Sequence, residues 1–484
     1  MFNLMAQGAA MLSQPDVIIA LIAGTLGGMF IGAMPGLSAS MAVALLIPVT
    51  FGMSGEAGIT LLTAVYTSAI YGGSITACLL HTPGTPASAA TAADGFALTK
   101  QGKGLKAIGV STVASMIGGT ISAIALLFIA PALSQVALKF SSLEYFLIGV
   151  FGLTIIGSLA GDNMMKGLLS GCLGLMIGCI GLDIQSSAPR YCFGILELQS
   201  GIQLVPAMIG LFSLSQVMFS IEDVAKGKHT VLDENAKNLT GSPVPTWKEF
   251  KPLIPTIAQS SIIGVLVGIL PGAGGDIGSW ISYNTAKNSS KHPEEFGHGS
   301  LVGIAASETA NNAVTGGALI PLLTLGIPGS GVAAIMLGGL MIKGLTPGYK
   351  LFSDPTTGPI VYCIILAFAL ANVLMGVAGL GICKQVVKIS TIPMTILAPM
   401  IVALSTVGSY AVRQSIFDVW VMLVFGFIGY FMRKYGFATA PVVLAMILGP
   451  IAESNWRQTL TITKRTGLIL GNGHVEGAVA LGNF

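Results

Sequence analysis

The chain has 484 residues, of which 53% are hydrophobic and only 9% are charged, and its formal net charge is +3. Soluble domains carry about 25% charged residues, so a soluble fold of this composition could not cover its surface with polar groups. The small, dispersed positive charge includes no basic tract, which argues against a nucleic-acid partner. We therefore predict an all-α polytopic membrane protein with about 10 to 12 membrane elements.

The first apolar run predicts a membrane helix over about residues 16–34, after a short mixed lead. This helix is expected to break at Pro35-Gly36, because proline removes a helix hydrogen bond and kinks the chain. Leu37–Phe51 continues as a second apolar half.

The next run, Ala57–Ala93, is uncharged and too long for one crossing. It is interrupted at Pro83-Gly84, which predicts a helical hairpin or a broken helix with its tip at Thr82–Thr85. Three lysines follow the run and predict a cytoplasmic edge: Lys100, Lys103 and Lys106.

Further spans are expected at about 107–133, 143–160, 167–187 and 203–220. The polar segment 222–251 then predicts a linker between an N-terminal membrane repeat, 1–221, and a C-terminal membrane repeat, 252–452. The second half contains a break at Pro271-Gly272 and a long run, Thr309–Ile342, with a predicted hairpin tip at 328–331. Spans at about 356–382, 391–408, 415–432 and 436–451 precede a polar tail, 453–484.

The two halves share a motif, Gly-x-x-x-Gly-x-x-Pro-Gly, at residues 28–36 and 264–272. The pairs Gly72-Gly73 and Pro83-Gly84 are echoed by Gly316-Gly317 and Pro328-Gly329, with a one-residue difference in spacing. A weaker echo joins 157–160 to 408–411. Two structural repeats with broken helices indicate a transporter, in which an odd number of crossings per half would invert the repeats. The sequence leaves open whether the halves run parallel or inverted.

Helix breaks inside a membrane expose backbone groups that lipid cannot satisfy, so they must be buried or line a watery cavity. The N-terminal end of a half-helix suits an anion, and loosened carbonyl groups suit a small cation. We therefore predict substrate contacts at Pro35, Gly36, Ser38, Ser40, Thr82, Pro83, Gly84, Thr85, Gly272, Gly274, Gly275, Pro328, Gly329 and Ser330. Oxygen-bearing side chains predict a possible Na⁺ site at Asp276, Ser307, Asn311 and Asn312.

Each candidate has a structural alternative. Serine and threonine in membrane helices commonly bond to their own backbone. Asp276 and Glu308 are either ligands or acids solvated at an interface. His81 is either a proton-linked group or a satisfied helix histidine, and Asp94 is either functional or a cap at the hairpin edge.

Arg190 and Arg413 are either anion ligands or interfacial anchors. Enzyme motifs such as H-E-x-x-H, G-x-S-x-G and the P-loop are absent from the sequence, and the glycine-rich stretch 272–278 lacks a βαβ context. We therefore predict neither an enzyme nor a cofactor.

At these same residues the chain resembles the large membrane subunit of the tripartite tricarboxylate transporters. The resemblance extends from the first span to about Pro450, and four stretches carry it: G-M-F-I-G-A-M-P-G, Y-G-G-S-I-T-A-C-L-L-H-T-P-G-T-P, G-I-L-P-G-A-G-G-D-I and S-E-T-A-N-N-A-V-T-G-G. It implies a carboxylate importer of a bacterial inner membrane, driven by Na⁺ or H⁺. It also implies two partners, a small membrane subunit and a periplasmic substrate-binding protein.

The family is similar to the ion-transporter superfamily, which implies inverted repeats, two re-entrant hairpins and an elevator-type motion. The hypothesis of a di- or tricarboxylate symporter competes with two alternatives, an ion-conducting channel and a carrier for another small organic anion. A channel favours repeated charged or carbonyl rings, whereas this chain has two unequal copies of one motif.

Overall fold

A computed structural model describes residues 2–34, 37–81, 84–137, 139–154, 163–183, 186–226, 241–270, 274–389 and 394–466. The described chain is helical almost throughout, which confirms the predicted all-α class. The first half contains α1 (Phe2–Leu12), α2 (Pro15–Gly32), α3 (Ala39–Leu46), η1 (Pro48–Gly52), α4 (Gly55–Leu80), η2 (Pro86–Ser88), α5 (Ala89–Lys100), α6 (Gly104–Ala137), α7 (Ser142–Thr154), α8 (Met164–Gly178), β1 (Gly181–Leu182), β2 (Pro189–Arg190), η4 (Leu196–Ser200), α9 (Leu204–Met208), the π-helical turn η5 (Ile209–Leu214) and α10 (Ser215–Ala225).

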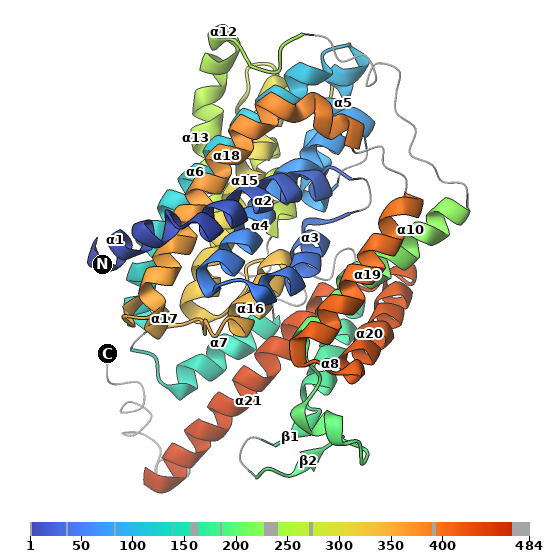
Figure 1. The fold of residues 1–484 in the computed structure, drawn as a ribbon. Helices are drawn as coiled ribbons and strands as arrows, with labels where there is room; N and C mark the ends of the chain where they lie inside the picture. Colours follow the sequence, from blue (N-terminus) through green and yellow to red (C-terminus); the bar gives the residue numbers. More distant parts are fainter. Residues whose placement is uncertain are drawn as a thin grey trace.

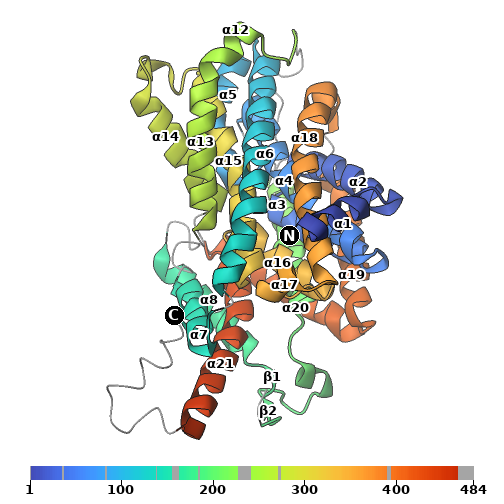
Figure 2. The ribbon, with the colours of Figure 1, turned by 90° about the vertical axis from the view of Figure 1, so that its left-hand side faces the viewer.

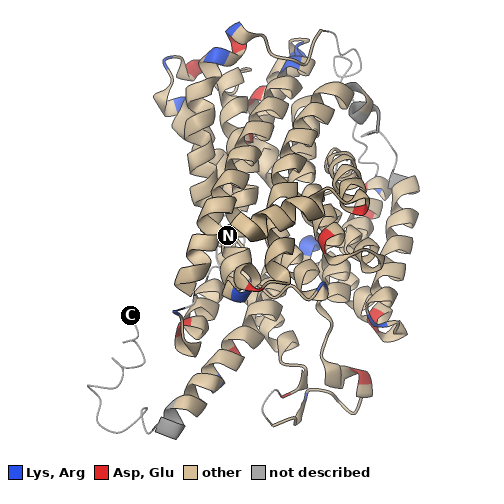
Figure 3. Cartoon of the chain, turned by 60° about the vertical axis from the view of Figure 1, so that its left-hand side comes forward, with Lys and Arg blue, Asp and Glu red and all other residues tan. Residues whose placement is uncertain are grey.

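The second half contains α12 (Trp247–Phe250), η6 (Lys251–Leu253), α13 (Ile254–Ile269), α14 (Gly274–Ser289), η7 (Pro293–Glu295), α15 (Leu301–Leu325), α16 (Gly331–Ile342), α17 (Tyr349–Ser353), α18 (Thr357–Ile389), α19 (Met394–Arg413), α20 (Ile416–Lys434) and α21 (Ala440–Thr466). Among the described residues, eight helices are long and apolar enough to cross a membrane. Figure 3 shows few charged residues across the middle of the molecule, whereas basic and acidic residues gather at the end where α5 and α12 lie. The chain is a multi-pass membrane protein.

The helices form a central bundle and two peripheral bundles (Figures 1 and 2). The central bundle contains α2 to α6, α13 to α16 and α18. The last two helices of the second half both pack on the first half: α21 packs on α7 and α8, whereas α20 packs on α9, η5 and α10. The peripheral bundles therefore exchange elements between the halves.

Both predicted helix breaks fall between helices. α2 ends at Gly32 and α3 begins at Ala39, where the Ser38 hydroxyl caps the helix by accepting a hydrogen bond from the Met41 N–H at 3.2 Å. In the second half, α13 ends at Ile269 and α14 begins at Gly274. The breaking residues themselves lie outside the described residues: Pro35, Gly36, Pro271 and Gly272.

The motif glycines make matching close approaches in the two halves. A side chain at Gly28 would meet the Val65 carbonyl oxygen at 2.7 Å, and one at Gly264 would meet the Ala310 carbonyl oxygen at 2.6 Å. Gly32 and Gly268 face the Ala69 and Val314 carbonyl oxygens in the same way. The contacted residues of α4 and α15 differ by the same number of positions at both points (310 − 65 and 314 − 69 are both 245), so α4 corresponds to α15 without a gap.

This correspondence corrects the predicted register of the hairpins. Gly84 faces Gly73, whereas Gly329 faces Ala318, so Ala318 takes the place of Gly73. Gly317 then corresponds to Gly72, and the one-residue difference in spacing disappears. The sequence misled because glycine recurs at neighbouring positions, and only the packing partner shows which one is equivalent.

The two halves also meet at equivalent points. At the end of α5, the Gln101 side-chain amide donates to the His298 carbonyl oxygen at 3.0 Å, and after α16, Lys343 Nζ donates to the Met53 carbonyl oxygen at 2.7 Å. Figure 2 shows α6 running from the end where α5 lies toward α7, and α18 running back from α17. These opposite directions support the interpretation of inverted repeats.

The close approach of α2 and α4 gives a direct test of this packing. Gly28→Ala should destabilise the chain by about 2 kcal/mol, because the added methyl group meets backbone atoms of Val65 that cannot move independently. Its neighbour provides the matched control, since a methyl group at Gly27 meets no atom within 4 Å. Thermal unfolding in detergent should therefore show a lowered Tm for Gly28→Ala only, and equal values for both variants would contradict the packing.

Several predicted boundaries change. The span over 167–187 is wrong at its end, because α8 stops at Gly178 and the β1–β2 hairpin follows. The predicted lead contains α1, and the tail begins inside α21, which continues to Thr466. The weak echo at 157–160 lies outside the described residues, as do residues 227–240 of the linker.

Candidate functional site

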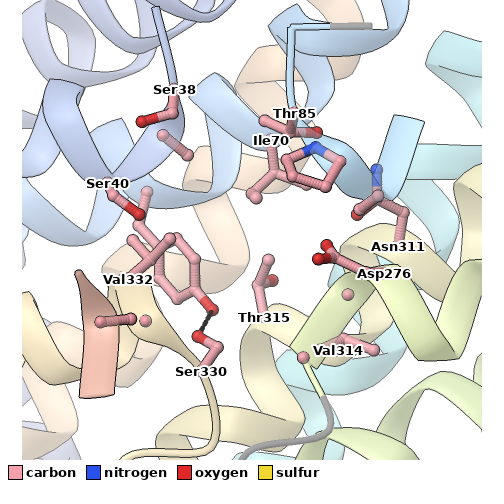
Figure 4. Close-up of a pocket in the computed structure, with 18 of the residues that line it drawn as sticks. Ser38, Ser40, Ile70, Thr85, Asp276, Asn311, Val314, Thr315, Ser330 and Val332 are labelled. Atoms are coloured by element: carbon pink, nitrogen blue, oxygen red, sulfur yellow. Dashed lines mark hydrogen bonds between the residues drawn. The ribbon is translucent and has the colours of Figure 1, made fainter. Parts of the chain in front are cut away.

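A cavity of about 310 Å³ lies where four helices of the central bundle begin (Figure 4). The helices α3, α14 and α16 start at its wall, and α5 approaches it through the short helix η2. Two of these elements come from each half. The cavity therefore joins both predicted helix breaks and both predicted hairpin tips.

The converging helix starts favour a bound anion. The first N–H groups of an α-helix have no partner within the helix, and each N-terminus carries roughly half of a positive elementary charge. Helix ends that converge in this way give the cavity wall a partial positive charge that favours a carboxylate. None of the described lining residues is lysine, arginine or histidine, so the attraction comes from the backbone.

The lining is built from equivalent residues of the two halves whose chemistry differs. Ser40, Tyr66 and Ile70 of the first half correspond to Asp276, Asn311 and Thr315 of the second. The second-half wall is thus the more polar one. The pairs that line the cavity include Ser38 and Gly274, Ser40 and Asp276, Tyr66 and Asn311, Ile70 and Thr315, and Thr85 and Ser330.

Three of the predicted hydroxyl ligands also serve their local structure. Ser38 and Ser330 cap α3 and α16 by accepting hydrogen bonds from Met41 N–H and Ala333 N–H, both at 3.2 Å. The Ser330 and Tyr66 hydroxyls are 3.2 Å apart, and those of Thr85 and Ser88 are 2.9 Å apart. These bonds fix the hydroxyls at the wall, where a second lone pair or proton can meet a ligand.

Asn311 differs from these hydroxyls because its amide has no hydrogen-bond partner among the described residues. The side chain is only 1% exposed and lines the cavity on the same side as Asp276 (Figure 4). Buried polar atoms without partners are rare and costly. Asn311 is therefore the lining residue best placed to bond to a ligand.

Asp276 is exposed and lies in the first turn of α14, where the helix dipole stabilises a carboxylate. Its negative charge on the cavity wall suits a cation beside a bound anion. The predicted role as an ion ligand and the alternative role as a solvated acid both fit this position.

The other predicted substrate residues divide into two groups. Gly84 and Gly329 do not line the cavity but allow the hairpins to approach Gly32 and Gly268, whose carbonyl oxygens a side chain would meet at 2.5 Å. Pro328 is buried beside Gly329. The remaining predicted residues lie outside the described residues: Pro35, Gly36, Thr82, Pro83 and Gly272.

The four residues of the predicted Na⁺ site do not meet at one point. Asp276 and Asn311 line the cavity, whereas Ser307 lies behind it, 2.8 Å from the Thr91 hydroxyl. Asn312 Nδ2 lies 3.4 Å from the Thr67 hydroxyl, which donates to Asn372 Oδ1 at 2.7 Å. Asn312 thus belongs to a polar contact among α15, α4 and α18.

Sequence reasoning missed several lining residues, among them Tyr66, Ile70 and Thr315. They lie inside long helices rather than at breaks, so no local motif marks them. The available signal was the repeat: with α4 and α15 in the correct register, Tyr66 is the counterpart of Asn311.

The remaining ionisable candidates have structural roles. His81 ends α4 in a left-handed conformation and stacks on Phe96. Arg190 Nη1 bonds to Glu453 at 2.6 Å, and Arg413 bonds to the buried Asp418 at 2.5 Å, so both arginines are paired with acids away from the cavity. Asp94 accepts hydrogen bonds from the backbone N–H groups of residues 297, 299 and 300. It therefore acts as a cap, as the structural alternative proposed, but for a segment of the second half rather than for the edge of its own hairpin.

Comparison with known proteins gives one family. The model of the tripartite tricarboxylate transporter TctA family matches residues 18–444. An uncharacterized 52.8 kDa protein in the TAR-I ttuC′ 3′ region of Agrobacterium vitis is 34% identical over 455 residues, which cover 94% of this chain and 89% of that protein. A second protein, in the TAR-II ttuC′ 3′ region of the same organism, is 39% identical over 201 residues, 42% of this chain and 82% of that protein. No solved structure matches the chain.

Proposed function

The chain belongs to the tripartite tricarboxylate transporter TctA family, and we propose that it is the transport subunit of a symporter that imports a di- or tricarboxylate with Na⁺ or H⁺. Membership makes the chain a transporter component rather than an enzyme. We further propose that it works in a bacterial inner membrane with a small membrane subunit and a periplasmic substrate-binding protein.

The observation that carries the proposal is the convergence of four helix N-termini on one cavity. Pockets for small ligands begin at about 300 Å³, so a cavity of 310 Å³ is large enough for a compact carboxylate. A dianion or trianion would find backbone N–H donors from both halves and the Asn311 amide on one wall.

The origin of the lining residues supports an elevator-type motion. All described lining residues except Ala440 come from the central bundle, and Ala440 is the first residue of α21 in a peripheral bundle. A ligand held almost entirely by one body can travel with it, as an elevator requires. In a rocking mechanism, the two moving bodies would contribute more equally to the site.

Reconstitution tests this function directly. Proteoliposomes that contain the chain and its small subunit should accumulate a radiolabelled di- or tricarboxylate only with an imposed Na⁺ or H⁺ gradient and ligand-loaded binding protein. Vesicles without the gradient, and vesicles given ligand without binding protein, are the controls. Uptake that equilibrates without a gradient, or unitary currents in a planar bilayer, would instead indicate a channel.

A further inference from the structure

The central bundle contains a buried acid that the proposed anion site does not use. Glu308 on α15 is 0% exposed. Its Oε1 accepts a hydrogen bond from the Thr91 hydroxyl at 2.5 Å, and its Oε2 accepts one from the Ser115 hydroxyl at 3.0 Å. Ser307 adds a third hydroxyl, 2.8 Å from that of Thr91.

No arginine, lysine or histidine forms an ion pair with Glu308 in the part of the chain that the structure describes. An ionised carboxylate without a counter-charge is strongly unfavourable in a protein interior, even with hydroxyl donors. The carboxyl group is therefore neutralised from outside the chain, either by a proton or by a bound cation. The ligands at this point are one carboxylate and several hydroxyl oxygens, the set that a hard cation prefers.

We propose that Glu308, Thr91, Ser115 and Ser307 form a binding site for a single Na⁺ ion. One carboxylate balances one monovalent charge, whereas a divalent cation would remain half compensated. Each hydroxyl carries two lone pairs, and Ser307 already has backbone acceptors for its proton at Gly303 and Ile304. The Ser307 oxygen can thus face a cation while its proton bonds to the backbone.

The position of the site connects it to the cavity. Thr91 lies on α5, Ser115 on α6 and Glu308 on α15, so a bound cation ties the first hairpin to the second half. The Asn311 side chain, one turn further along α15, faces the Glu308 carboxyl and also lines the cavity. This proposal rests on the proposed symport for its physiological meaning, since Na⁺ here would fix the wall that receives the carboxylate.

Cation binding can be measured on the purified full-length chain without any carboxylate. In a titration of NaCl against choline chloride at constant ionic strength, the Tm of the wild-type chain should rise with Na⁺. Glu308→Gln keeps the side-chain shape but removes the charge, and should raise the apparent Kd for Na⁺ at least tenfold. Ser115→Ala and Thr91→Ala remove one oxygen each and should weaken binding about threefold or more, which tests the site even if Glu308→Gln does not fold.

Thr324→Val is the matched control, because Thr324 is a buried threonine of the same helix as Glu308 whose hydroxyl donates to the Ile320 carbonyl oxygen at 2.7 Å. It should leave the Na⁺ response unchanged. A wild-type response retained in the Ser115 and Thr91 variants would overturn the proposal, and so would a chain that responds to pH but not to Na⁺. The binding assay contains no carboxylate, so lost Na⁺ binding in the variants supports this site even if reconstituted vesicles show no uptake. Na⁺-driven uptake by Glu308→Gln would overturn the site and leave the proposed symport intact.

Discussion

Replacing Asn311 with leucine is expected to raise the KM for carboxylate uptake by about 10- to 100-fold while the chain keeps its Tm. A hydrogen bond to a charged ligand contributes about 1.5–3 kcal/mol, which corresponds to that range. Stability should hold because the Asn311 amide makes no hydrogen bond of normal geometry among the described residues, and leucine removes only its looser contact with the Glu308 carboxyl.

The neighbouring asparagine provides a matched control. Asn312 is equally buried, but its Nδ2 faces Thr67 at 3.4 Å, away from the cavity lining. Asn312→Leu should therefore change the KM by less than about twofold and lower the Tm slightly, since two weak internal bonds, to Thr67 and Met375, are lost. Equal KM values for wild type and Asn311→Leu, with normal insertion of both, would remove Asn311 from the site.

The different roles of these adjacent residues show what the sequence could predict. The breaks, the hairpin tips and the polar residues beside them were predictable because Pro-Gly and uncharged run length act locally. The side of α15 that faces the cavity was not, because α15 is buried on nearly every side and lacks an amphipathic pattern. The sequence therefore groups Asn311 and Asn312 in one site, although they point to different neighbours.

Tyr66 and Glu308 show two further limits. Tyr66 has no motif of its own and enters the site only because α4 and α15 are equivalent, a register that close backbone contacts establish. Glu308 was visible as an acid in an apolar run, but an interfacial position was an equal alternative. Only the packing of α5 and α6 against α15 shows that it is buried among hydroxyl groups.

Asp94 should produce the largest loss of stability among the variants considered. Its Oδ1 accepts three backbone hydrogen bonds, from Gly297, Gly299 and Ser300 at 2.8–2.9 Å. Its Oδ2 accepts the Tyr283 hydroxyl at 2.9 Å, and the side chain is fully buried. One carboxylate on α5 thus holds the segment that precedes α15.

Asp94→Ala should lower the free energy of unfolding by about 3–5 kcal/mol, because four donors, those of Tyr283 and Ser300 buried, lose their acceptor at once. Asp94→Asn keeps one oxygen for the backbone donors and should cost less, and Tyr283→Phe should cost about 1 kcal/mol because it removes a single bond. The control is Asp354→Ala, since Asp354 is exposed and its carboxylate bonds to neighbouring residues such as Thr356. In thermal unfolding in detergent, Asp94→Ala should lower the Tm most, Asp94→Asn and Tyr283→Phe should lower it less, and Asp354→Ala should lower it least.

The contact between Asp94 and residues 297–300, called the Asp94 clamp below, also has a functional consequence that stability measurements would not reveal. Asp94 lies on α5, and Thr85 and Ala87, just before this helix, line the cavity. Asp94 also contacts the segment that leads into α15, the helix that carries Asn311 and Glu308. Loosening the Asp94 clamp should separate the two halves at the site, because the carboxylate joins them directly. Asp94→Asn, which should still fold, is therefore expected to reduce the uptake rate more than Tyr283→Phe does, at equal amounts of inserted protein. If both variants transport at the wild-type rate despite a lowered Tm, the clamp contributes to folding but does not set the geometry of the cavity.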